Sequence, residues 1–432
     1  MNRKTISAYT LGCKVNQYDT SAMLEEFIRH GYDVLPFGEK TDVVIVNTCT
    51  VTGTGDNKSL KTIRRCAREN PDVSIIAAGC LAQREAQEVA QMANVRLVMG
   101  TKRREGVALA LEKAVMSGET VIAVEGLEDA EFENVQVDSA EGRTRAILKI
   151  QEGCKNRCSY CAIPLARGPV RSRGIDSIRS EVKRLCEKGF SEIVLTGIHL
   201  NSYGLDSGLT MTDAVIAALE SAGEKSRLRL GSLEPGGHYG EFCQSIIKKD
   251  LEKKLCPQFH LSLQSGSDGV LGRMKRRYTT DIYRQSVEDL RRHFPGCAIT
   301  TDIIAGFPGE TQDEFEETLS FIKEIGFARV HAFPYSERSG TPAAAMAGQL
   351  PVHIRQQRAG QVIKAAGEAA ESFMQSKLGQ RLEVIFEEQR GELARGYCQH
   401  YLRCEAKNAP IGEIIGFAAK EIKGGVIIGE LL

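Results

Sequence analysis

The chain has 432 residues, 42% of them hydrophobic, and its 56 basic and 56 acidic residues give a formal net charge of zero. This length suggests two or three domains with real cores, and the neutral balance excludes a protein that binds nucleic acid through overall charge alone. Thirteen cysteines in so long a chain are not the dense pattern of a small disulfide-bonded secreted domain. The sequence shows neither a signal-type apolar start nor an apolar run long enough for a membrane span, so we expect a cytoplasmic protein with no membrane partner.

The first part of the chain, residues 1–117, alternates predicted strands with predicted helices. Strands are expected at Thr5–Thr10, Asp42–Val46, Ser74–Ala77 and Arg96–Met99. Helical patterns are expected at Ser21–His30, Gly55–Arg68, Arg84–Met92 and Arg103–Val115. Strand–helix alternation with short connections predicts an α/β domain with a Rossmann-like parallel sheet.

Three cysteines of this part follow predicted strands at the same structural position. They are Cys13, Cys49 and Cys80. Because the carboxyl ends of parallel strands line one crevice of an open sheet, we expect the three thiols to meet there. Such a group predicts an iron–sulfur cluster or a metal site; three buried thiols at strand ends are the alternative.

Residues 118–142 mark a break in composition. Glu119–Gly142 contains eight acidic residues and no Lys or Arg. We expect an extended linker or a surface hairpin, with its charges on a solvated face.

The second part, residues 143–374, shows six further strand–helix units. Strands are expected near Ile147, Val194, Leu228, His260, Asp302 and His331. Helical patterns lie between them, at positions such as Ile178–Lys188, Asp281–His293 and Gln312–Ile325. A complete barrel of this kind has eight units, so six predict a partial (β/α)6 barrel whose chemistry lies at the carboxyl ends of the strands.

Three more cysteines, Cys154, Cys158 and Cys161, follow the first of these strands with C-x-x-x-C-x-x-C spacing. Three thiolates can hold three irons of a four-iron cluster and leave the fourth iron open to a small molecule. Structural zinc usually has four protein ligands, and no fourth Cys or His lies within twenty residues on either side. The spacing therefore favours an iron–sulfur cluster with an open position over a zinc knuckle.

The third part, residues 375–432, shows short alternating segments typical of antiparallel strands. They are expected at Arg381–Phe386, Leu393–Cys398 and Tyr401–Glu405. A helix over Gln361–Met374 connects them to the second part. The pattern predicts a small β-barrel, a fold that often binds oligonucleotides. Tyr397, His400 and Tyr401 are candidates for base stacking, with core packing as the favoured alternative.

Basic clusters flank both groups of cysteines in this neutral chain. Arg143–Arg173 contains eight Lys or Arg residues and a single acid, Glu152. Together such clusters can hold RNA phosphates, although each alone is usually a solvated face. The residues predicted to contact RNA are Arg167, Arg171, Arg173, Arg276 and Arg277. The first three of these could instead bind the carboxylate of a cofactor.

Nearly the whole sequence resembles the radical S-adenosylmethionine (SAM) methylthiotransferases. The resemblance lies in NTC at Asn47–Cys49, HLSLQSGSD at His260–Asp268 and DIIAGFPGET at Asp302–Thr311. TGIHLNSYG at Thr196–Gly204 and HAFPYSERSGTPAA at His331–Ala344 resemble the subgroup that acts on N6-threonylcarbamoyladenosine in tRNA. The resemblance implies the same three-part fold, with a TRAM-like β-barrel at the end.

By this resemblance, Cys154, Cys158 and Cys161 hold a [4Fe–4S] cluster whose open iron binds the amino and carboxylate groups of SAM. One electron then cleaves SAM to methionine and a 5′-deoxyadenosyl radical. No catalytic residue beyond the cluster ligands is predicted. The residues expected to bind SAM are Tyr160, Ser232, Glu234, Gly306, Phe307, Pro308 and Gly309. For Tyr160 the alternative is loop packing, and for Ser232 and Glu234 it is capping of a strand end.

Cys13, Cys49 and Cys80 match the ligands of the family's second [4Fe–4S] cluster, where sulfur is delivered, methylated and passed on. The implied reaction replaces the hydrogen on carbon 2 of N6-threonylcarbamoyladenosine 37, in the anticodon loop of tRNA, with a methylthio group. It requires an external electron donor and a sulfur donor. Isopentenyladenosine in tRNA and an aspartate of a ribosomal protein are alternative substrates. An alternative of another class is a non-catalytic RNA-binding protein that contains an iron–sulfur cluster or zinc.

Overall fold

The computed structural model describes residues 3–128, 130–137 and 144–432, and the chain forms two compact units. The first, here called the cysteine unit, contains residues 1–141, 151–173 and 336–344. The second, here called the barrel unit, contains residues 142–150, 174–335 and 345–432. All six predicted cluster ligands therefore belong to one unit. The domain boundaries expected after residues 117, 142 and 374 stay predictions, because the units combine segments from either side of them.

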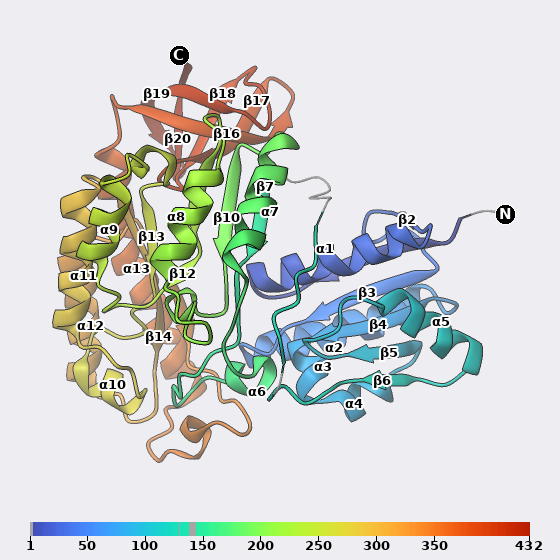
Figure 1. The fold of residues 1–432 in the computed structure, drawn as a ribbon. Coiled ribbons are helices and arrows are strands. Elements are labelled where there is room, and N and C mark those ends of the chain that lie inside the picture. Colours follow the sequence, from blue (N-terminus) through green and yellow to red (C-terminus); the bar gives the residue numbers. More distant parts are fainter. Residues whose placement is uncertain (1–2, 129, 138–143) are drawn as a thin grey trace. The chain divides into compact units, whose positions relative to one another are not determined.

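The cysteine unit is built on a six-stranded sheet (Figure 1). Its strands are β1 (Thr5–Thr10), β2 (Asp33–Val34), β3 (Val43–Thr48), β4 (Ser74–Gly79), β5 (Val95–Met99) and β6 (Val121–Ala123). They run parallel in the order β2-β1-β3-β4-β5-β6. The four predicted strands are confirmed. The expected linker or hairpin is wrong for Val121–Ala123, because this short apolar run pairs with β5 and extends the sheet.

Helices cover both faces of this sheet. They are α1 (Lys14–Arg29), α2 (Gly53–Glu69), α3 (Cys80–Arg84), α4 (Ala86–Ala90) and α5 (Val107–Ser117). Phe27 of α1 and Leu111 of α5 share one apolar core with the sheet, whereas Ile63 of α2 and Val89 of α4 share the other. The three layers are those of a doubly wound α/β fold, as predicted.

Parallel strands also form the frame of the barrel unit. They are β7 (Arg145–Lys149), β10 (Glu192–Thr196), β11 (Arg227–Leu230), β12 (Ser232–Leu233), β13 (Gln258–Leu261), β14 (Ala298–Ala305) and β15 (Arg329–Pro334). These strands form two sheets, β11-β10-β7 and β12-β13-β14-β15. The chain passes directly from the first sheet to the second, because only Gly231 separates β11 from β12. Counting β11 and β12 as one position gives six positions in chain order, which confirms the partial (β/α)6 barrel.

Helices lie along the outside of these strands (Figure 1). They are α7 (Ile175–Glu187), α8 (Met211–Ser221), α9 (Tyr239–Ile247), α10 (Asp268–Arg273), α11 (Thr280–His293), α12 (Gln312–Ile325) and α13 (Val352–Gln375). In α11 the buried residues Tyr283, Val287 and Leu290 recur at helical spacing and form its inward stripe. Within the described ranges of the chain, no helix is both long and apolar enough to cross a membrane.

The chain ends in a closed β-barrel that is part of the barrel unit. Its strands are β16 (Arg381–Arg390), β17 (Leu393–Cys398), β18 (Arg403–Lys407), β19 (Ile414–Lys423) and β20 (Val426–Leu431). The order around the barrel is β16-β17-β18-β20-β19, and all pairs are antiparallel except β18 with β20. The small, mainly antiparallel barrel is the TRAM-like fold expected from the sequence.

A buried ion network joins this β-barrel to the amino-terminal ends of β10 and β11. The Glu192 carboxylate accepts hydrogen bonds from Nε of Arg227 and Nε of Arg229, both at 2.7 Å. The same guanidinium groups donate to the carbonyl oxygens of Glu383 and Gln399 at 2.9 and 3.1 Å. Burial alone would raise the pKa of Glu192, but Arg229 and Arg227 hold it below its ordinary value. Since loss of one partner of a buried pair costs about 3–5 kcal/mol, this network fixes the two barrels together.

The aromatic residues considered for base stacking lie in this contact. The Tyr397 and Tyr401 rings stack with centroids 4.7 Å apart, and the Arg229 guanidinium lies 4.9 Å from the Tyr401 ring. His400 is 7% exposed, and its burial lowers its pKa to about 3. Core packing is therefore confirmed for His400, whereas Tyr401 is partly exposed and packs against Tyr397 and Arg229.

Candidate iron–sulfur and cofactor sites

Cys13, Cys49 and Cys80 lie at the carboxyl ends of three neighbouring strands. Cys13 directly precedes α1, Cys49 directly follows β3, and Cys80 is the first residue of α3. The order β2-β1-β3-β4-β5 is that of flavodoxin-like sheets, in which the ligand crevice opens between β1 and β3. Burial, together with the nearby Cys80 and Cys13, raises the pKa of the Cys49 thiol to about 12. The three thiols are therefore neighbours in the fold, and their role as cluster ligands stays a prediction.

The loop before Cys13 fits closely against Cys49. Gly12 has a φ of +92°, and a Cβ atom at this position would lie 2.7 Å from the Cys49 Sγ atom. Only glycine adopts this backbone conformation readily and also leaves room for the thiol. The three-thiol donor set and this close-fitting loop suit the thiolate ligation of an iron–sulfur cluster. Among the residues that the structure describes, no group of three Cys, His, Asp or Glu side chains is placed to hold a single metal ion.

A buried arginine contacts this group of cysteines. Arg167 is fully buried, and its Nε atom lies 3.2 Å from the Cys80 Sγ atom. Its Nη1 atom donates to Asp19 at 2.8 Å and to Glu152 at 3.1 Å, and its Nη2 atom donates to Asn16. Burial would lower the pKa of Arg167, but Cys80, Glu152 and Asp19 raise it well above its ordinary value. The guanidinium is therefore a permanent cation beside Cys80.

These contacts do not fit the predicted role of Arg167 as an RNA contact, because its donors are engaged inside the protein. Arg171 and Arg173 are 4% and 2% exposed; Arg171 donates to the Arg167 carbonyl, and Arg173 to the Tyr18 hydroxyl at 3.2 Å. The physical reason is the folding of the basic segment into the cysteine unit, where Arg167 meets the buried acids Asp19 and Glu152. We therefore do not retain Arg167, Arg171 and Arg173 as candidates for binding RNA.

The second group of cysteines lies on a loop closed by two short strands. β8 (Gln151–Glu152) pairs with β9 (Arg171–Ser172), and the loop between them carries Cys154, Cys158, Cys161 and helix α6 (Ile163–Arg167). The Cys154 amide donates to the Gly168 carbonyl at 3.0 Å, and the Asn156 amide donates to the Cys154 Sγ atom at 3.4 Å. Cys158 is buried, whereas Cys154 and Cys161 are partly exposed. A thiolate at Cys154 would be stabilised by this amide, since hydrogen bonds favour the charged form.

A segment far along the chain ties the two cysteine loops together within the cysteine unit. The Gly53 amide, in the connection after Cys49, donates to the Ser336 hydroxyl at 3.0 Å. The Ala343 amide donates at 2.8 Å to the carbonyl of Ser159, which lies between Cys158 and Cys161. Tyr160, the next residue and a predicted SAM contact, is partly exposed.

A cavity of about 510 Å3 opens beside Cys154 in the cysteine unit. Its lining includes Gln83, Leu127, Lys155, Asn156, Arg157 and Leu165. Lys155 and Arg157 are exposed. The loop that carries the second cysteine group is therefore accessible from solvent on a basic side.

The remaining predicted SAM contacts belong to the barrel unit, at the carboxyl ends of its strands. Ser232 is exposed, and its hydroxyl lies 2.8 Å from that of Ser262. The Glu234 carboxylate lies 2.7 Å from both His199 Nε2 and Arg276 Nη2. The Glu234 carboxylate is thus held at the end of the strand by two partners, and Arg276 forms an ion pair with it.

The predicted loop Gly306–Gly309 follows β14 and is held firmly in place. The Gly306 amide donates to Glu310 at 2.8 Å, and Glu310 forms an ion pair with Arg358 at 2.7 Å. Phe307 and Pro308 are buried, whereas Gly309 is exposed. Burial raises the pKa of Glu310 although Arg358 opposes this shift. The roles of Ser232, Glu234 and this loop in SAM binding stay predictions.

Sequence reasoning missed a polar cluster between β13, β14 and β15. His260 Nδ1 lies 3.0 Å from the Thr300 hydroxyl, and His260 Nε2 lies 3.2 Å from the Asp302 carboxylate. The His331 ring lies 6.1 Å from that of His260. The sequence feature that could have revealed this cluster is the alternation of polar residues along strands that are otherwise apolar.

Comparison with known proteins finds similar families and relatives. A model described as the radical SAM superfamily matches residues 148–322, and one described as uncharacterized protein family UPF0004 matches residues 5–100. The threonylcarbamoyladenosine tRNA methylthiotransferase MtaB of Bacillus subtilis (strain 168) is 37% identical over 99% of this chain and 95% of its own. The tRNA-2-methylthio-N(6)-dimethylallyladenosine synthase of Moorella thermoacetica is 34% identical over 89% of this chain and 87% of its own.

Among solved structures, the radical SAM methyltransferase TsrM from Kitasatospora setae matches with a TM-score of 0.54 and 15% identity. The match covers 79% of this chain and 75% of TsrM, which supports the fold alone. The fold and the C-x-x-x-C-x-x-C loop are those of a radical SAM enzyme. Together with the identities above, they show that the chain belongs to the radical SAM methylthiotransferase family.

We expect the Gly153→Ala variant to disturb the loop of the second cysteine group. Gly153 has a φ of +72°, and an added Cβ would collide with the Pro169 carbonyl oxygen. The free energy of unfolding should fall by about 3 kcal/mol or more, as for other changes that force the backbone to move. Gly31 is a matched control, because its φ is +81° but nothing lies within 4 Å of its added Cβ. Gly31→Ala should cost only about 1–2 kcal/mol, the cost of a left-handed backbone conformation for a residue with a Cβ. Equal losses in urea unfolding of the two variants would contradict this account.

Proposed function

We propose that the protein transfers a methylthio group to carbon 2 of N6-threonylcarbamoyladenosine 37 in tRNA. The observation that carries this proposal is the presence of two separate groups of three cysteines in one compact unit. Family membership supports the reaction type, and the names of the relatives from Bacillus subtilis, Aquifex aeolicus and Thermotoga maritima support the substrate. A tRNA substrate is in turn the reason to propose action in the cytoplasm.

Cys154, Cys158 and Cys161 would hold the cluster that works with SAM. Bound there, a [4Fe–4S] cluster with SAM supplies a carbon radical able to remove hydrogen from an aromatic carbon. The protein holds the loop in shape through the Cys154 amide and the contact of Ser159 with Ala343. We further propose that Tyr160, Ser232, Glu234 and the Gly306–Gly309 loop, including Phe307 and Pro308, bind SAM.

Cys13, Cys49 and Cys80 would hold a second [4Fe–4S] cluster, at which the transferred sulfur is bound. Support comes from the mutual influence of the three thiols, the close fit of Gly12 and the cation beside Cys80. Removal of hydrogen and delivery of sulfur would then be divided between two metal sites. The overall reaction needs an external electron donor and a sulfur donor as further partners.

A second candidate substrate is the dimethylallyl-modified adenosine of tRNA. The relative from Moorella thermoacetica, 34% identical, carries the name of the enzyme that makes its methylthio derivative. The two substrates differ in the group on N6, which is a charged amino acid in one case and a hydrocarbon in the other.

The test is an anaerobic reaction of the reconstituted protein with SAM, a reductant and tRNA that carries N6-threonylcarbamoyladenosine. We expect the digested nucleoside to gain the mass of one methylthio group, with release of 5′-deoxyadenosine and methionine. A parallel reaction with tRNA that carries dimethylallyladenosine distinguishes the two substrates. Protein that holds both clusters but modifies neither tRNA would refute the proposed reaction.

Separate substitutions in the two cysteine groups should distinguish cleavage of SAM from transfer of the methylthio group. Cys158→Ala should abolish formation of 5′-deoxyadenosine, because the cluster that works with SAM loses a ligand. Cys49→Ala should leave some cleavage of SAM and stop methylthiolation. Iron should fall from about eight to about four per chain in either variant. Full product from Cys49→Ala would contradict the role of the second cluster.

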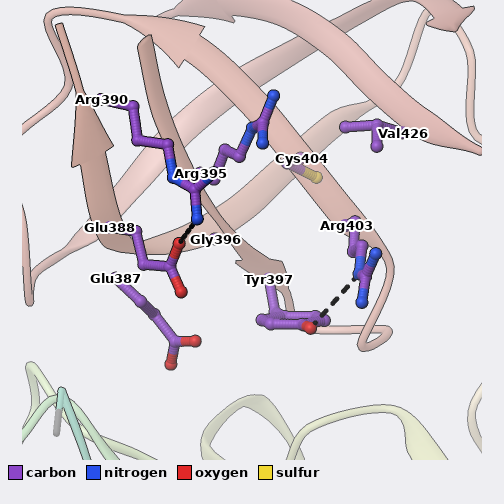
Figure 2. Close-up of a pocket in the computed structure, with 9 residues that line it drawn as sticks. All are labelled: Glu387, Glu388, Arg390, Arg395, Gly396, Tyr397, Arg403, Cys404 and Val426. Carbon is purple, nitrogen blue, oxygen red and sulfur yellow. Dashed lines mark hydrogen bonds and ion pairs between the residues drawn. The ribbon is translucent and has the colours of Figure 1, made fainter. Parts of the chain in front are cut away.

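We also propose that the β-barrel contributes to tRNA binding through a surface cavity of about 340 Å3. Figure 2 shows Arg390, Arg395 and Arg403 around this cavity together with Tyr397, Glu387 and Glu388, and Arg390 forms an ion pair with Glu388 at 3.6 Å. Arg403 Nε lies 3.4 Å from the Tyr397 hydroxyl, and Arg395 forms an ion pair with Glu405 at 2.6 Å. Cations beside an aromatic ring suit phosphate binding with base stacking. Arg277, which is exposed in the barrel unit, stays a predicted RNA contact.

Replacement of both Arg390 and Arg403 by Ala should weaken tRNA binding without unfolding the β-barrel, because both side chains are exposed. The dissociation constant should rise, and its dependence on salt should lose a slope of about 2, one for each phosphate contact. Lys420→Ala, an exposed cation of β19 outside the cavity, serves as the control. Point substitutions are preferable to deletion of the β-barrel, which would leave Glu192, Arg227 and Arg229 exposed. An unchanged salt slope in the double variant would remove this cavity from the RNA-binding surface.

A further inference from the structure

The buried guanidinium of Arg167 has a fixed orientation in the cysteine unit. Each of its three nitrogens has a separate partner: Nη1 contacts Asp19 and Glu152, Nη2 contacts Asn16, and Nε contacts Cys80. Because the group is planar and its N–H bonds diverge in a rigid fork, the first two sets of contacts direct the Nε–H toward the sulfur. The hydrogen bond to Cys80 is therefore imposed by the surroundings rather than by the chance position of a flexible side chain.

Charges of both signs surround Arg167 in the described part of the cysteine unit. Three acids lie in the network, Asp19, Glu152 and Glu133, and three arginines, Arg104, Arg167 and Arg171. Asp19 Oδ2 is shared between Arg104, at 2.7 Å, and Arg167, at 2.8 Å. Arg167 is in direct contact with Cys80, so it acts on a thiolate there both through its charge and through the Nε–H···S hydrogen bond.

We propose that Arg167 sets the reduction potential of the cluster bound by Cys13, Cys49 and Cys80, through its hydrogen bond to the Cys80 thiolate. This inference rests on the second cluster of the proposed function. A hydrogen bond to a ligating thiolate withdraws electron density from the sulfur and stabilises the reduced cluster, which carries one more negative charge. Arg167 is thus a positioning residue that makes this cluster easier to reduce.

The same side chain links the two metal sites along the chain. Arg167 ends helix α6, which closely follows Cys161, and Glu152 closely precedes Cys154. Arg167 and Glu152, which form an ion pair, therefore flank the loop that carries Cys154, Cys158 and Cys161, while the Arg167 guanidinium contacts Cys80. A structural role alone would require the ion pairs with Asp19 and Glu152 but not the contact with sulfur.

The test measures the potential of the second cluster by itself. In a full-length background with Cys154, Cys158 and Cys161 all replaced by Ala, anaerobic reconstitution should give about four irons per chain. The midpoint potential is then measured by redox titration followed by electron paramagnetic resonance. Arg167→Gln should shift the potential to more negative values. Arg104→Gln is the matched control, because it removes a cation that shares Asp19 but does not contact a cysteine.

The outcomes separate this inference from the proposed function. Absence of a cluster in the triple-cysteine background would refute the second cluster itself. A full complement of iron with an unchanged potential in Arg167→Gln would refute only the role of Arg167, as would an equal shift in Arg104→Gln. If Arg167→Gln does not fold, Arg167→Lys keeps the positive charge but lacks the Nε–H in the plane of the guanidinium. It should still shift the potential to more negative values, and a native potential would overturn the proposal.

Discussion

Parallel strands that are joined through helices all end at the same edge of their sheet, and this constraint gives the protein its chemistry. In the cysteine unit, β1, β3 and β4 are neighbours, so the residues after them converge although they are far apart in sequence. Cys13, Cys49 and Cys80 occupy those positions. In the barrel unit the same rule places Ser232, Glu234 and the loop after β14 at the carboxyl ends of the strands.

The opposite ends of the barrel strands serve stability. There the buried carboxylate of Glu192 is shared by Arg227 and Arg229, whose remaining donors bind carbonyl groups of the terminal β-barrel. Charges this deeply buried are costly unless every one is paired, so the network requires the two barrels to stay together. The exposed arginines near Tyr397 are thereby held on a rigid support, whereas the residues proposed to bind SAM lie at the other ends of the strands.

Local sequence patterns predicted most strands and helices, and the few wrong predictions have identifiable physical causes. Strands such as β1 and β17 matched their predicted bounds, because alternating apolar residues are bounded there by clear turn signals. Val121–Ala123 was missed as a strand because it lies in an acidic segment, and its pairing with β5 outweighed the local composition. Helix α1 was expected from Ser21 but begins at Lys14, where the buried Asn16 side chain bonds the carbonyls of Leu11 and Thr48.

The sequence by itself determined the two groups of cysteines, the family and the reaction class, because ligand spacing and short motifs are local properties of the chain. It could not determine the surroundings of those cysteines. Arg167 looked like an exposed cation in a basic segment, and only folding showed that it is fully buried against Asp19, Glu152 and Cys80. The physical reason is that a charge acquires its function from partners that lie far away in sequence, and the tertiary structure alone brings those partners within hydrogen-bonding distance.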